Sequence, residues 1–127
     1  FCFIIGMTAA NAEIPALIMD YVESRIDKIL PVDMMGLDDA TEYVKDLMNA
    51  YRIDEKKNID YFPFDKAAVK TIIDVTEITP RKVSKRMETA LIYSRRAGFS
   101  PAKGKKITSK FLEDNGIIEE LGVIEEF

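Results

Sequence analysis

The stretch that decides the fold is EITPRKVSKRMETALIYSRRAG, residues 77–98. Thr79 is a hydroxyl residue of the kind that caps a helix, and Pro80 suits the first helical position. Apolar residues then recur at three- and four-residue spacing as far as Ala97, and Gly98 is a typical residue for a helix end. This stretch therefore predicts an amphipathic helix from Thr79 to Ala97.

The segments on both sides of this helix also have helical spacing. Apolar stripes predict one helix over 37–52 and another over 65–75, with Asp65 as the cap of the second. A shorter helix is expected around 111–112, where Asn115-Gly116 stops it. The fold class predicted from these patterns is mainly α, a bundle of about four helices.

The N-terminal part of the chain has a different pattern. Residues 2–6 are a short apolar stretch that suits a buried strand, and residues 28–32 are a second candidate strand. Residues 13–27 between them have the spacing of an amphipathic helix. A strand needs neighbours, so these one or two short strands are expected to belong to a sheet that lies mostly outside this chain.

Composition excludes several classes of function. The chain has 127 residues, a net charge of −4, one cysteine and no histidine. These counts rule out a disulfide framework, a zinc cluster and a Ser-His-Asp triad, and we expect no metal site. No apolar run approaches the roughly 18 residues that span a membrane. We expect a protein without a membrane span, located in the cytoplasm.

Two segments imitate nucleotide-binding motifs. Residues 98–106 resemble a phosphate loop, but five residues separate the glycines and a lysine stands where Ser or Thr should bind magnesium. Residues 72–77 resemble an apolar strand that ends in acids, yet they lie within a helical pattern. The chain therefore carries no phosphate loop and is not expected to hydrolyse a nucleotide unaided.

Charge is unevenly distributed along the chain. Cations dominate residues 80–110, with Glu88 as the single anion, and residues 113–126 are rich in acids. Such an arrangement can neutralise itself, and the acidic apolar tail is expected to pack on something. The basic segment can alternatively be a surface that binds nucleic-acid phosphates.

The order of these elements resembles the second half of an AAA+ ATPase, most similar to the branch of origin-recognition initiators and secretion- and transposition-type ATPases. A buried strand ends in Gly6-Met7-Thr8, a helix ends in Ser24-Arg25-Ile26, and Glu77-Ile78-Thr79-Pro80-Arg81 begins a later helix. The resemblance covers about residues 1–114. It implies that 1–35 end an α/β P-loop nucleotide-binding core, that 36–115 form a helical lid domain, and that 116–127 are a tail or linker.

The resemblance also implies roles for individual residues. Arg81 corresponds to the sensor 2 arginine of the lid, which binds the nucleotide. Thr8 or Asn11 corresponds to the sensor 1 polar residue, and Arg25 to an arginine finger that acts on a neighbouring copy. The cofactor implied is ATP, with magnesium bound mainly by the half of the ATPase upstream of this chain.

Other interpretations remain open. Each arginine can be a plain surface ion-pair residue, Arg25 with Glu23 or Asp27 and Arg81 with Glu77. The chain can also be a helical DNA-binding module that uses residues 81–106, or a helical scaffold that binds a partner protein. The resemblance favours a part of an ATPase whose partners are ATP, other copies of itself and, through the parent protein, DNA.

Overall fold

The computed structural model describes residues 32–53, 60–101 and 104–124. Contacts divide the chain into Phe1–Asp33 and a second compact unit, Met34–Phe127, which contains all the described helices. The strands expected over 2–6 and 28–32 lie outside the described residues, apart from Val32. The α/β core is therefore not part of the structure described below.

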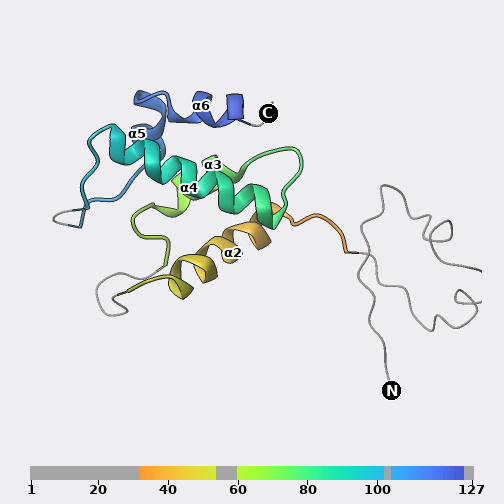
Figure 1. Ribbon diagram of the computed structural model, residues 1–127. Coiled ribbons are helices and arrows are strands. Elements are labelled where there is room, and N and C mark those ends of the chain that lie inside the picture. Colours follow the sequence, from red (N-terminus) through yellow and green to blue (C-terminus); the bar gives the residue numbers. More distant parts are fainter. Residues whose placement is uncertain (1–31, 54–59, 102–103, 125–127) are drawn as a thin grey trace, which may run out of the picture. The chain divides into compact units, whose positions relative to one another are not determined.

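The described residues are mainly helical, as the sequence predicts, and contain no named strand. Five helices follow one another in this part of the chain (Figure 1). They are α2 (Leu37–Ala50), α3 (Lys66–Ile73), α4 (Pro80–Arg96), α5 (Ser109–Asp114) and α6 (Ile117–Ile124). None of them is long and apolar enough to cross a lipid bilayer.

Side-chain caps fix where three of these helices begin. The carboxylate of Asp65 accepts a hydrogen bond from the Ala68 amide at 2.7 Å at the start of α3. Thr79 caps α4 and Thr108 caps α5 in the same way, through the amides three residues further on. These bonds satisfy amides that have no partner within the helix, which confirms the predicted starts at Asp65 and Thr79.

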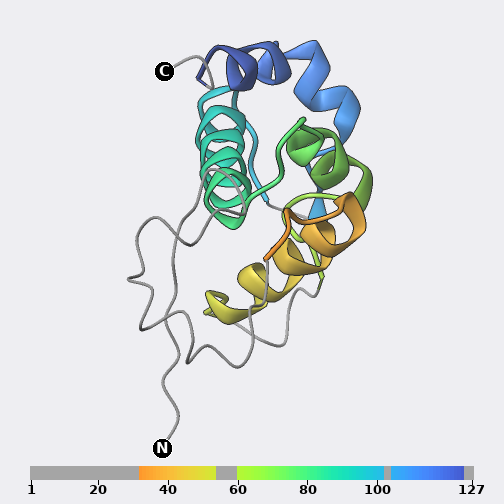
Figure 2. The same cartoon turned by 90° about the vertical axis from the view of Figure 1, so that its right-hand side faces the viewer.

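The core lies among α2, α3, α4 and α6, and α5 packs against α3 and α6 (Figures 1 and 2). Phe64 and Ile107, both fully buried, form an isolated parallel bridge that joins the segment before α3 to the segment before α5. The largest fully buried side chains are Phe64, Ile72, Ile73, Ile107, Leu112, Leu121, Val44, Val69 and Val83. Burying side chains of this size contributes about 1.5–3 kcal/mol each.

Helix α6 occupies the segment that the sequence analysis describes as a tail or linker. Its buried residues Ile117 and Leu121 belong to the core, and its acids Glu119 and Glu120 are exposed. Gly116, with a φ of 65°, ends the preceding turn in a conformation that favours glycine. The alternation of acidic and apolar residues here is therefore the pattern of a short amphipathic helix.

A buried arginine joins three of the helices. Arg86 of α4 is 8% exposed, and its Nε donates a hydrogen bond to the carbonyl of Ile72 in the last turn of α3. Its Nη1 donates to the carbonyl of Leu121 in α6 at 3.3 Å. Carbonyls in the last turn of a helix have no partner within the helix, and a cation there is favoured by the helix dipole.

We expect Arg86→Met to destabilise the protein by about 2–3 kcal/mol, because it leaves buried carbonyls without these donors. Urea unfolding followed by circular dichroism measures the change. Arg95→Met is the matched control: Arg95 lies exposed on the same helix, and its loss should change stability by less than about 0.5 kcal/mol. Equal stability of the two variants would contradict this role of Arg86.

Candidate functional site

The first turn of α4 is built by its cap and its proline. Thr79 is extended, with φ −121° and ψ 153°, and its hydroxyl accepts a hydrogen bond from the Lys82 amide at 3.3 Å. Pro80 follows at the start of the helix, where its missing amide is not needed. The next residue, Arg81, is exposed on the first turn of a well-defined helix.

The alternative interpretation, an ion pair between Arg81 and Glu77, is not the pairing that forms. Glu77 pairs with Lys82, whose Nζ lies 3.4 Å from the Glu77 carboxylate. Among the residues that the structure describes, no ion pair includes Arg81. The guanidinium of Arg81 is therefore available to an anion outside these residues.

The turn before α4 is bonded to the segment where the chain enters the helical unit. The amide of Met35 donates to the carbonyl of Ile78 at 3.1 Å, and Ile78 is buried. Arg81 follows Ile78 by three residues. This bond brings Arg81 and the segment that leads from residues 1–33 into α2 to the same end of the unit.

The other predicted site residues cannot be located in this way. Thr8, Asn11 and Arg25 lie outside the described residues. No cluster of metal-ligating side chains is present in the described part of the chain.

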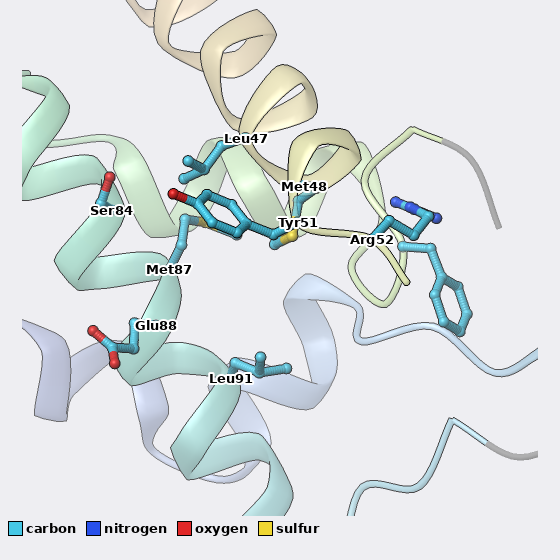
Figure 3. Close-up of a pocket in the computed structure, with 9 residues that line it drawn as sticks. Leu47, Met48, Tyr51, Arg52, Ser84, Met87, Glu88 and Leu91 are labelled. Carbon is cyan, nitrogen blue, oxygen red and sulfur yellow. The ribbon is translucent and has the colours of Figure 1, made fainter. Parts of the chain in front are cut away.

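A groove that the sequence analysis did not predict lies between the C-terminal half of α2 and the middle of α4 (Figure 3). Its volume is about 860 Å³, and it is lined by Leu47, Met48, Tyr51, Arg52, Phe62, Ser84, Met87, Glu88 and Leu91. Tyr51 is 81% exposed although it continues the apolar stripe of α2. The groove arises because the end of α2 extends past the side chains that bury its first half.

Polar contacts surround the groove without filling it. Tyr43 Oη and Ser84 Oγ lie 3.3 Å apart and link α2 to α4 near one side. On another side, Arg52 donates to the carbonyl of Asp60 at 3.2 Å. Burial, together with the carboxylate of Glu42, raises the pKa of the Tyr61 hydroxyl.

The groove offers apolar surface and the flexible side chains of Met48 and Met87, which suit a packed partner better than catalysis. Arg81 at the start of α4 is the one predicted site residue whose position the structure gives. Neither a protein-family model, nor a curated protein, nor a solved structure matches this chain.

The cap that positions Arg81 can be tested directly. Thr79→Ala removes the hydroxyl that accepts from Lys82, so we expect a loss of about 1 kcal/mol in the free energy of unfolding. Thr89→Ala is the control, because the same chemical change within α4 should be neutral or slightly stabilising. Urea unfolding compares the two, and equal effects would show that the cap does not stabilise the start of α4.

Proposed function

We propose that the helical unit is the lid of an AAA+ type ATPase and that Arg81 is its sensor 2 arginine. The observation that carries the proposal is the position of Arg81: exposed, free of ion pairs with the described residues, and held on the first capped turn of α4. A mainly helical unit that follows Asp33 also agrees with a lid.

The chemistry of a guanidinium suits this role. Hydrolysis of ATP spreads negative charge over the oxygens of the transferred phosphoryl group, and a positioned arginine can stabilise that charge, contributing on the order of 10³-fold in rate. Arginine keeps its charge at all physiological pH values and donates hydrogen bonds in a fixed planar arrangement. Arg81 therefore offers a permanent positive charge and a planar set of hydrogen-bond donors, held at the capped start of a helix.

The hydrogen bond between Met35 and Ile78 supports a mechanism of coupling. Because the start of α4 is bonded to the segment that enters the unit, a rotation of the unit about that segment carries Arg81 with it. Nucleotide state would then be sensed as a change in how far Arg81 reaches toward the γ-phosphate. In this mechanism the lid binds the nucleotide only when closed.

The remaining parts of the proposal lie in residues 1–33 and upstream. Thr8 or Asn11 acts as the sensor 1 residue, and Arg25 acts as an arginine finger toward a neighbouring copy. ATP and magnesium are bound mainly by the upstream half of the ATPase, and the assembly works in the cytoplasm.

In the full-length ATPase that contains this chain, Arg81→Ala should lower turnover or raise the KM for ATP by ten-fold or more. The melting temperature should hardly change, because an exposed arginine contributes little to stability. Lys85→Ala, one turn further along the same face of α4, is the control and should leave ATPase kinetics unchanged. Unchanged kinetics in Arg81→Ala would make Arg81 an ordinary surface residue.

The 127-residue chain by itself should not hydrolyse ATP above background, because it has no phosphate loop. Phosphate release in the presence of magnesium and ATP measures this. Magnesium-dependent turnover that survives repurification of the chain would rule out a lid that depends on an upstream core.

A further inference from the structure

The face of α4 that points away from the other helices is positively charged. Its exposed charged residues recur at helical spacing around Ile92, and they are Arg81, Lys85, Glu88, Arg95 and Arg96. Leu91, which is 40% exposed, lies at the edge of this face and also lines the groove. We call its four cations, Arg81, Lys85, Arg95 and Arg96, the outer basic face. The opposite side of the helix carries the buried residues Val83, Arg86, Met87, Ala90 and Ser94.

The outer basic face is not neutralised by the acids of the same unit. Lys82, beside the face, pairs with Glu77, but among the described residues no ion pair includes a cation of the outer basic face. The acids of α5 and α6 that could have neutralised it are exposed instead, and they are Glu113, Asp114, Glu119 and Glu120. The positive charge of α4 therefore faces solvent.

The cations lie in two groups along the helix. Arg95 lies ten positions after Lys85, which is about 15 Å along the axis at 1.5 Å per residue. Arg96, next to Arg95, stacks its guanidinium on the ring of Tyr93 at 5.7 Å, which restricts its orientation. The face thus has two positive ends, with Glu88 and the 43% exposed Ile92 between them.

This spacing suits double-stranded DNA. The major groove is about 12 Å wide, so a helix with cations about 15 Å apart can lie across it and reach the phosphates on both sides. Glu88 then lies over the groove, away from the phosphates of either strand. Binding to an anionic membrane would favour several large apolar side chains beside the cations, whereas this face has Ile92, with the partly exposed Leu91 at its edge.

We propose that the outer basic face of α4 binds the phosphate backbone of double-stranded DNA without sequence preference. The proposal rests on the charge and exposure of α4 and does not depend on a role in ATP hydrolysis. Arg81 is the residue shared with the proposed nucleotide site, so the test substitutes other members of the face.

The test is binding of the 127-residue chain to a fluorescent 24-base-pair duplex, measured by anisotropy between 50 and 200 mM salt. If each of the four cations contacts one phosphate, the logarithm of the association constant should fall with the logarithm of salt with a slope of about −3.6. The association constant should therefore fall about 150-fold between 50 and 200 mM salt. For the double variant Lys85→Gln/Arg95→Gln the slope should halve to about −1.8. Its association constant should then fall only about 12-fold between 50 and 200 mM salt.

Lys66→Gln/Lys110→Gln is the matched control. It removes two exposed lysines from α3 and α5, so both double variants lower the net charge equally and differ only in where the charge is lost. The control should keep the slope of the unsubstituted chain. Equal far-ultraviolet circular dichroism shows that all three proteins fold alike, and Lys85→Gln/Arg96→Gln provides a second test pair.

Three results would overturn the proposal. The first is no binding of the duplex at 50 mM salt. The second is an equal loss of slope in the control, which would reflect total charge rather than the outer basic face. The third is binding to phosphatidylserine vesicles without binding to DNA, which would make the face a membrane-binding surface.

Discussion

The rest of the unit depends on one buried cation, Arg86. Moving a guanidinium out of water costs several kcal/mol, so it is stable inside a protein only where enough acceptors surround it. The end of α3 supplies the carbonyl of Ile72, and α6 supplies that of Leu121. This requirement, together with the burial of Val83, Met87 and Ala90 on the same side, fixes the rotation of α4 about its own axis. Five residues correspond to about 140° of rotation on a helix, so turning Arg86 inward turns Arg81 outward.

The sequence predicts those features of the fold that depend on interactions between residues close together in the chain. The starts at Asp65 and Thr79 were predictable because a cap acts on an amide three residues away. Arg86 was not, because its acceptors are backbone carbonyls 14 and 35 residues away that carry no side-chain signature. In the sequence Arg86 is one more cation in a basic segment. The packing of α6 also depends on contacts with residues far away in the sequence. From the sequence alone, its residues are therefore interpreted as an acidic tail.

The candidate site likewise has one feature that the sequence predicts and others that it does not. Thr79-Pro80-Arg81 predicted an arginine on a capped helix start, and the structure has it there. Glu77 pairs with Lys82 rather than with Arg81, a choice between two neighbouring cations that residue spacing alone does not predict. The groove beside Tyr51 escaped prediction because a helical apolar stripe does not reveal where the neighbouring helix stops covering it.

Both proposals, the sensor 2 role of Arg81 and DNA binding by the outer basic face, involve residues of α4. The turn before α4 is bonded, through Ile78 and Met35, to the segment where the chain enters the unit, and the middle of α4 is fixed to α3 and α6 by Arg86. A helix held at both places moves with the unit as one body rather than sliding within it. Any rotation that changes the reach of Arg81 toward a nucleotide therefore also turns the outer basic face. Nucleotide state and DNA contact would be coupled by the rigidity of a single helix, without a separate conformational change inside the unit.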